Sequence, residues 1–398
     1  MTETLRQGVL ALIHSAVSGE AKTLPEGFDL EAAMPLIQKH KINNLIYYGA
    51  RNCGVDTSSS VMKSLFLVTY QAMCADERQR EQLARVFSAF DANGIEYMPV
   101  KGVLMKARYP KPDMRIMGDA DVLIRLEQYE KIRPIMESLG FTEKLESDHE
   151  LIWTHPSLYL ELHKRLIPSY NYDYAAYYGD GWQLGHSSKE NPCRYEMADE
   201  DEMIYLFTHF AKHYRDGGIG VRHMLDLYLY RKTKPDLNME YLMTELKKLQ
   251  LDAFYENIYR TLDAWFEGGQ SDEMTAHISD FIFRSGVYGE RDAHRIAQGL
   301  RDKANEGGSN KQVRKRAWLK LIFLPYGSMR EKYPVLGKCP ILLPIMWVVR
   351  WLSALFKNPQ TISQQRRNLK LLSEDKLNAW ESQMQAVGLG FHFEENEQ

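Results

Sequence analysis

Residues Met98–Ile124 read MPVKGVLMKARYPKPDMRIMGDADVLI, and the architecture of the chain follows from this stretch. It ends in a strand-like run in which Asp119 and Asp121 are interleaved with apolar residues. Strand residues two apart point to the same side of a sheet, so both carboxylates would lie on one face. Two like charges on a largely buried strand repel each other and are costly to desolvate unless a cation neutralises them. The stretch therefore predicts a site for a divalent metal ion.

A third carboxylate is expected, because two-metal phosphoryl transfer clamps both the attacking and the leaving oxygen. The segment Leu158–Leu166, LYLELHKRL, supplies Glu161 in a β-type alternation, with Glu161 and His163 facing the same way. A neighbouring strand would carry Glu161 to the face that holds Asp119 and Asp121. We expect His163 to support this site rather than to bind the metal.

The order of these motifs resembles the DNA polymerase beta-like nucleotidyltransferase superfamily. Its members share a strand, a small-residue turn, a helix, a strand with Asp-x-Asp, and a later strand with a third acid. More closely, the Lys101-Gly102 turn, Arg115 and the Leu-Glu-Leu-His run look like the bacterial family called the uncharacterised nucleotidyltransferases. The resemblance covers the region from Ile95 to Arg231 well and the flanks loosely.

The resemblance implies transfer of a nucleoside monophosphate from a nucleoside triphosphate, such as ATP, to an acceptor hydroxyl, with release of pyrophosphate. Asp119, Asp121 and Glu161 would form the catalytic group and bind Mg²⁺ or Mn²⁺. Glu161 would also lie near the acceptor oxygen. The acceptor class stays open between a small molecule, a glycan, a protein and an RNA.

The predicted nucleotide-binding turn departs from the wider superfamily, which usually has Gly-Ser where this chain has Lys101-Gly102. Gly102 still permits close backbone approach, and Lys101 would replace the hydroxyl contact with a point charge. Lys101 and Arg115 would stabilise the negative charge on the phosphates as pyrophosphate leaves. Arg115 as an ordinary surface charge is the alternative.

A second landmark of the family is a His on one helix followed by an Arg and an Asp on the next. In this chain the matching residues are His209, Arg222 and Asp226, and Arg222 would join the nucleotide-binding set. The residues allow an equally good structural interpretation, in which Arg222 and Asp226 form a buried ion pair four positions apart on one helix.

The alternation of patterns predicts an α/β (α+β) nucleotidyltransferase core with a small mixed sheet, flanked by N-terminal and C-terminal helical regions. We expect four parts: an N-terminal helical region at 1–94, the nucleotidyltransferase core at 95–196, a helical domain completing the cleft at 197–305, and a basic, apolar C-terminal segment and tail at 306–398. Helices are expected at Leu5–Val17, Leu30–Tyr48, Val61–Met73, Asp76–Asn93 and Glu127–Leu139, and strands at Ile95–Val100, Asp119–Ile124, Leu151–Thr154 and Tyr159–Leu166.

Composition is that of an ordinary folded protein, with 44% apolar and 26% charged residues among 398. The four cysteines are scattered without CxxC spacing, which favours a reducing compartment over a disulfide framework or a zinc site. The first residues lack the basic region of a secretory signal. We therefore expect a cytoplasmic protein.

The net charge of −3 hides a strongly basic segment at Lys311–Lys370, which has thirteen Lys or Arg and one acid. The rest of the chain is correspondingly acidic, so bulk DNA binding by the transferase body is not expected. Within the segment, Cys339–Phe356 is apolar but broken by two prolines and an arginine, and its tryptophans suit a lipid headgroup region. The segment predicts contact with an anionic membrane surface, at the inner face, unless it is a buried helix packed on the acidic body.

Three other functions are compatible with the sequence. The core could bind a nucleotide without turning it over, as a sensor or scaffold at the membrane surface, for example in surface polysaccharide assembly. The acceptor could be a protein or an RNA, as in toxin-like members of the superfamily. The basic C-terminal segment could itself be the main function, in a membrane-associated structural protein.

Overall fold

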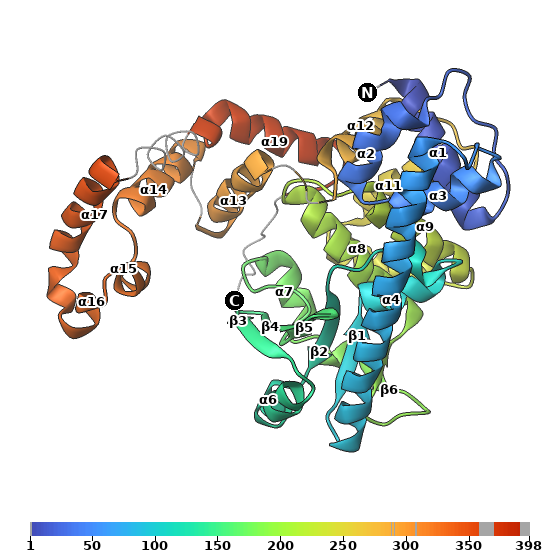
Figure 1. Cartoon of the computed structure of the whole chain (residues 1–398). Helices are drawn as coiled ribbons and strands as arrows, with labels where there is room; N and C mark the ends of the chain where they lie inside the picture. Colours follow the sequence, from blue (N-terminus) through green and yellow to red (C-terminus); the bar gives the residue numbers. More distant parts are fainter. Residues whose placement is uncertain (1, 288, 290, 307–308, 358–369, 391–398) are drawn as a thin grey trace. The chain divides into compact units, whose positions relative to one another are not determined.

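The computed structural model describes residues 2–287, 289, 291–306, 309–357 and 370–390 (Figure 1). Two compact units make up the chain. The first comprises Met1–Lys212 and Ile219–Tyr288, and the second comprises His213–Gly218 and Gly289–Gln398. The four-part division expected from the sequence stays a prediction.

The first unit is built on a five-stranded mixed sheet with the strand order β1-β2-β5-β4-β3. Its strands are β1 (Tyr97–Val100), β2 (Ala120–Ile124), β3 (Thr142–Glu146), β4 (Glu150–His155) and β5 (Leu158–His163). The pairing of β2 with β5 is parallel, and the other three pairings are antiparallel. The small mixed sheet that the sequence predicts is therefore present.

One face of this sheet packs against helices, and the other carries charge. Alternate residues of β2 and β5, such as Val122 and Leu160, join a core with Val86 of helix α4 (Ser60–Ala92) and Ile132 of helix α6 (Tyr129–Ser138). Because strand side chains alternate, the residues between them point away from this core.

Two strand regions were not predicted. The edge strand β3, with the sequence TEKLE, has mostly exposed side chains and lacks the apolar run that signals a buried strand. The short pair β6 (Gly185–Ser187) and β7 (Tyr195–Met197) lies in a stretch that reads only as polar and Tyr-rich.

The N-terminal helices differ from the predicted ones at two boundaries. They are α1 (Glu3–Ser18), α2 (Leu30–His40), α3 (Asn43–Asn52) and α4. The single helix predicted over Leu30–Tyr48 is wrong, because Lys41 adopts a left-handed conformation with φ 52° that ends α2. The two helices predicted on either side of Cys74 are one 33-residue helix, since no breaking residue separates them.

The turn after β1 is followed by short helical pieces, and longer helices follow the sheet. The short pieces are α5 (Gly102–Met105), η1 (Lys106–Arg108), η2 (Pro112–Met114) and, before α6, η3 (Leu126–Gln128). The later helices are α7 (Tyr172–Tyr178), α8 (Asp199–Arg215), α9 (Val221–Thr233), α10 (Met239–Lys248), α11 (Asp252–Phe266) and α12 (Glu273–Ser285), with η4 (Trp182–Leu184) after α7.

The second unit is helical where it is described. Its helices are α13 (Arg291–Glu306), α14 (Asn310–Ile322), α15 (Tyr326–Lys332), α16 (Val335–Lys338), η5 (Pro340–Leu342), α17 (Leu343–Lys357) and α19 (Glu374–Ala386). A small core forms around Leu300, Val313 and Leu377. Residues 358–369 of the predicted membrane-binding segment, and residues 391–398 of the predicted C-terminal tail, lie outside the described residues.

None of the described helices is both long and apolar enough to cross a membrane.

Candidate active site

Strand register brings the predicted carboxylates of β2 and β5 together. Asp121 lies directly opposite Glu161 in the parallel pair, and Val100 at the end of β1 lies opposite Asp121 on the other side. Both acids point away from the helix-packed face, as the alternation of the two strands requires. The juxtaposition of Asp121 and Glu161 was predicted from the two separate alternations.

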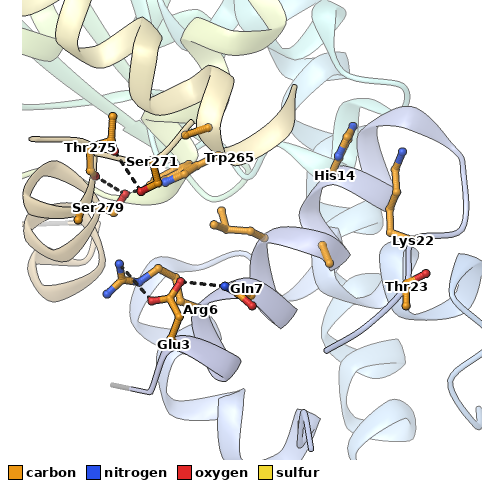
Figure 2. A pocket seen from close by; sticks show the side chains of 14 residues that line it. Glu3, Arg6, Gln7, His14, Lys22, Thr23, Trp265, Ser271, Thr275 and Ser279 are labelled. Atoms are coloured by element: carbon orange, nitrogen blue, oxygen red, sulfur yellow. Dashed lines mark hydrogen bonds and ion pairs between the residues drawn. The ribbon is translucent and has the colours of Figure 1, made fainter. Parts of the chain in front are cut away.

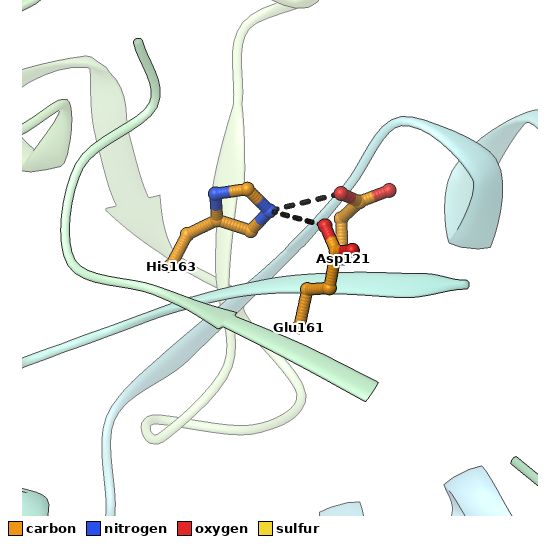
Figure 3. A group of neighbouring side chains, drawn as sticks. All are labelled: Asp121, Glu161 and His163. Carbon is orange, nitrogen blue, oxygen red and sulfur yellow. Dashed lines mark hydrogen bonds and ion pairs between the residues drawn. The ribbon is translucent and has the colours of Figure 1, made fainter. Parts of the chain in front are cut away.

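The carboxylate of Asp121 is the centre of a compact charged group. Its Oδ1 accepts hydrogen bonds from Lys101 Nζ at 2.7 Å and from His163 Nε2 at 2.9 Å. The same imidazole nitrogen lies 3.6 Å from Oε2 of Glu161 (Figure 3). One ligand atom from each of Asp121, Glu161 and His163 falls within 4.8 Å of the others, close enough to share a metal ion.

His163 is therefore nearer to the carboxylates than the sequence suggested. We expected a supporting residue, and the structure places its ring nitrogen with the ligand oxygens. The signal that points to it is the two-residue spacing from Glu161 on β5, which puts both side chains on one face.

Opposite charges decide the protonation of this group. Burial alone would raise the pKa of Asp121, but the Lys101 ammonium and then the His163 imidazole hold it well below its usual range. Burial would lower the pKa of Lys101, and the Asp121 charge raises it instead. Burial and Lys101 also work against the His163 cation, yet its hydrogen bonds to Asp121 and Glu161 raise the pKa of the imidazole. The group thus favours an ionised Asp121 beside the Lys101 ammonium, with a His163 imidazole that binds its proton more tightly than usual.

Asp119 occupies a different environment from Asp121. It immediately precedes β2, and part of the residue is open to solvent while its carboxyl is largely surrounded by protein. Desolvation of its carboxyl, followed by the negative charges of Asp121 and Glu161, raises the pKa of Asp119 to about 6. The protein thus leaves negative charge at Asp119 only partly compensated.

The Lys101-Gly102 turn after β1 has an unusual backbone and a tight interior. Lys101 adopts φ 50° and ψ −116°, which a side chain rarely tolerates. A Cβ atom on Gly102 would lie 2.9 Å from Nη1 of Arg115 and 3.5 Å from Cγ of Met117. Gly102 is therefore required for the close approach of Arg115 to this turn.

Arg115 ties the segment before β2 to helix α9. Its Nε and Nη2 donate to the two oxygens of Asp226, each at 2.9 Å, and Tyr109 adds a 2.7 Å hydrogen bond from its hydroxyl. Both members of the ion pair are buried. A bidentate pair of this kind is strong and geometrically specific. The alternative that Arg115 is a surface charge is therefore wrong.

The ion pair predicted between Arg222 and Asp226 is also wrong. Asp226 is already held by Arg115, whose planar guanidinium matches both carboxylate oxygens, and Arg222 instead donates from Nη1 to the carbonyl of Ile116 at 2.6 Å. Nε of Arg222 is buried without a hydrogen-bond partner, and burial followed by the charge of Arg115 lowers the pKa of Arg222. Arg222 is thus a cation whose charge the protein does not fully neutralise.

His209, the other residue of the second landmark, lies on α8. Its ring centroid is 6.5 Å from that of Tyr205, the neighbour one turn earlier. Tyr205 in turn has its pKa raised to about 12, by burial above all. Tyr109 was missed in the sequence, because nothing in its local spacing indicates a partner more than 100 residues away.

A separate hollow of about 440 Å³ lies between α1 and the α11–α12 region (Figure 2). Among the described residues lining it, Glu3 is the acid, and it pairs with Arg6, which also binds Asp280. Trp265 donates from Nε1 to Ser279 Oγ at 2.8 Å. The lining lacks paired carboxylates, so the metal-binding chemistry of the described residues centres on Asp121.

One protein-family model matches the chain over more than half of its length. The model of the family described as uncharacterised nucleotidyltransferase matches residues 26–267, which include the whole sheet and its charged group. No curated protein matches the chain. One solved structure, titled as the solution structure of the antibiotic-resistance factor ANT(2'')-Ia, is 15% identical, covers 48% of this chain and 97% of that chain, and gives a TM-score of 0.32.

A TM-score this low carries no argument about the site, so the assignment depends on the family match alone. That match covers more than half of the chain and contains the Lys101-Gly102 turn, the Asp-Ala-Asp strand and Glu161. The protein belongs to the uncharacterised nucleotidyltransferase family.

Proposed function

We propose that this protein transfers a nucleoside monophosphate from a nucleoside triphosphate to an acceptor hydroxyl, with the help of Mg²⁺ or Mn²⁺. Family membership supports nucleotidyl transfer in general. The observation that carries the specific proposal is the register of β2 and β5, which sets Asp121 opposite Glu161 with Lys101 Nζ 2.7 Å from Asp121. Asp119, Asp121 and Glu161 are the proposed catalytic residues.

The donor atoms of this group fit a divalent cation. Carboxylate oxygens suit Mg²⁺ and Mn²⁺, and the imidazole of His163 would join them as a ligand only in its neutral form. The raised pKa of Asp119 also supports a bound cation. After desolvation, its causes are the nearby negative charges of Asp121 and Glu161, which a cation would offset. When bound, the metal would polarise the phosphate and screen the charge of the departing pyrophosphate.

In the reaction, the acceptor oxygen forms a bond to the α-phosphorus while the bond from that phosphorus to the bridging oxygen breaks. Pyrophosphate leaves with the bonding electrons, and the hydroxyl proton passes to a carboxylate of the site. Glu161 orients the acceptor hydroxyl. Without a nucleotide, Lys101 is the cation that pairs with Asp121. Once a nucleotide is bound, the Lys101 ammonium instead stabilises the negative charge of the phosphates.

Arg115 and Arg222 have different proposed roles. Arg115 is held by Asp226 and so positions the turn at Gly102, where the backbone approaches the phosphates. Arg222 has a buried Nε without a partner, and we assign it to the nucleotide phosphates. Fixed charges aimed at the leaving group stabilise the transition state without reorganising.

Transfer is tested by incubating the protein with each of four α-labelled nucleoside triphosphates, Mg²⁺ or Mn²⁺, and a lysate as acceptor source. The Asp119→Asn, Asp121→Asn double variant should give no labelled product, whereas the control Asp236→Asn, at an exposed position, should match the wild type. Labelled product from the double variant would show that Asp119 and Asp121 do not hold the catalytic metal. The labelled product identifies the acceptor as small molecule, glycan, protein or RNA.

Metal binding is measured separately, by Mn²⁺ titration followed by electron paramagnetic resonance. Because Lys101 competes for Asp121, Lys101→Met should bind Mn²⁺ several-fold more tightly than the wild type in the absence of nucleotide. The exposed control Lys144→Met should not. Weaker Mn²⁺ binding by Lys101→Met than by the wild type would contradict this competition and show that Lys101 helps to bind the metal ion.

A non-catalytic nucleotide sensor or scaffold is the second candidate. The competition between Lys101 and a metal for Asp121 favours it, since a site that keeps its own cation could bind a nucleotide without turning it over. Nucleotide binding by titration, with no labelled product under any condition, would establish this function. Absence of binding with and without Mg²⁺ would leave the basic C-terminal segment as the main function.

A further inference from the structure

Helix α17 presents a row of aliphatic side chains to solvent. We call this row the aliphatic stripe, and its exposed fractions are Ile341 85%, Ile345 58%, Val348 46%, Val349 41% and Leu352 51%. Spacings of three and four residues put the last four on one side of the helix, and Ile341 lies in η5, just before α17 begins. Contiguous exposed apolar surface of this kind marks an interaction site.

The opposite side of α17 is fixed against the end of α14 and the residues that follow it. Trp347 donates from Nε1 to the carbonyl of Leu324, and Trp351 donates from Nε1 to the carbonyl of Ile322, both at 2.9 Å. The ring of Phe323 lies 5.0 Å and 5.6 Å from the two indole rings. The tryptophans therefore face inward, and the orientation that exposes the aliphatic stripe is held in place.

The same segment carries an excess of positive charge. Residues 310–353 contain nine Lys or Arg and one acid. Six exposed cations lie in this range, and none of them has a salt bridge to a described residue: Lys311, Arg314, Lys315, Arg330, Lys332 and Lys338. Exposed cations without a salt bridge to a described residue, in the same segment as an exposed apolar row, match a partner that is apolar and negatively charged.

We propose that the aliphatic stripe lies in the interface of an anionic lipid bilayer, with the six cations at the headgroups. Aliphatic side chains enter the boundary between headgroups and acyl chains, while Lys and Arg are attracted to acidic lipids. The 15 residues of α17 are fewer than the roughly 20 that a spanning helix takes, so the helix lies along the surface. A second copy of this chain is a poor occupant, because it would bring the same net positive charge to the contact.

This surface is independent of nucleotidyl transfer, so either proposal can fail alone. Its test is co-sedimentation of the full chain with vesicles of phosphatidylcholine, with and without phosphatidylglycerol. The wild type should bind only the anionic vesicles, and added salt should weaken binding. The Ile345→Asp, Leu352→Asp double variant should lose about tenfold or more of that affinity.

Leu126→Asp is the matched control, because Leu126 is also an exposed leucine, 54% accessible, but lies before α6. It should bind vesicles like the wild type. Equal binding by the double variant, or no binding of the wild type to anionic vesicles, would overturn the proposal. If the double variant instead changes the molar mass measured by light scattering and leaves vesicle binding intact, the stripe is a self-association surface.

Discussion

The sheet site and the α14–α17 segment treat charge in opposite ways. Around β2, buried charges form close pairs of opposite sign, such as Lys101 with Asp121 and Arg115 with Asp226. In the α14–α17 segment, cations such as Lys332 and Lys338 are exposed and form no salt bridge among the described residues, and aliphatic side chains face water. Charge inside a protein must be neutralised where it stands, whereas charge on the surface is free to attract a partner.

The difference also predicts where substitutions act. Removing one member of a buried ion pair should lower the stability of the fold, because the remaining charge is then neither paired nor hydrated. Changes on the exposed segment should leave stability nearly intact and alter binding instead.

The largest effect on stability is expected at the pair of Arg115 with Asp226. Asp226→Ala leaves a buried guanidinium unpaired and should lower the free energy of unfolding by about 3–5 kcal/mol, as measured by urea denaturation. The double variant Arg115→Met, Asp226→Leu should recover most of this loss. Asp263→Ala breaks the more exposed pair with Arg231 and should cost less than about 1 kcal/mol. Equal losses at the two pairs would erase the contrast between buried and exposed charge.

The next effect is a pH dependence at His40, whose ring is fully buried. Nδ1 accepts a hydrogen bond from Val221 N–H, so the ring is neutral and Nε2 donates to the carbonyl of Phe283. Burial lowers the pKa of His40 from 6.5 to about 4. The unfolded chain therefore binds the proton first, and stability present above about pH 6.5 is lost as the pH falls to about 4.

That shift corresponds to about 3 kcal/mol at the acid end. Urea denaturation across this range should show a shallower pH dependence for His40→Asn than for the wild type, whereas the exposed control His277→Asn should follow the wild type. An unchanged slope in His40→Asn would assign the acid sensitivity to other groups, such as His223, whose pKa burial lowers to about 3.

A smaller effect is expected from Gly102→Ala. The added methyl meets Arg115 Nη1 at 2.9 Å, so the turn or the arginine must shift, at a cost of about 1–3 kcal/mol. Nucleotide affinity should fall in the same variant. Gly118→Ala is the control, since its added methyl meets nothing within 4 Å. Equal stability and nucleotide binding in both variants would mean that the Arg115 contact does not require glycine.

The sequence predicts features that depend on neighbouring residues and misses contacts between distant segments of the chain. Alternation on one strand is a local property, so it was sufficient to place Asp121 and Glu161 on matching faces. The partner of Asp226 could not be found this way. The local spacing favours Arg222 on the same helix, but the three-dimensional fold delivers Arg115 from the segment before β2.

The strands show the same limit. β5 was expected because LYLELH alternates leucine with polar residues, and β3 was not, because an edge strand with exposed side chains has no apolar pattern to reveal it. Only one of the two roles of Lys101 could be predicted from the sequence. Its charge suggested phosphate binding, and its contact with Asp121 depends on strand pairing that a single segment does not contain.

The smallest effect on stability is expected on the aliphatic stripe. Ile345→Asp and Leu352→Asp should each change stability by less than about 0.5 kcal/mol, because both side chains are already in water. Trp351→Ala, on the inward side of α17, should cost at least about 1 kcal/mol through its lost hydrogen bond to Ile322. Amide hydrogen exchange of α17 measures both. Faster exchange in the Asp variants than in Trp351→Ala would mean that the stripe packs against the protein, and the contrast between a neutralised interior and an open binding surface would fail.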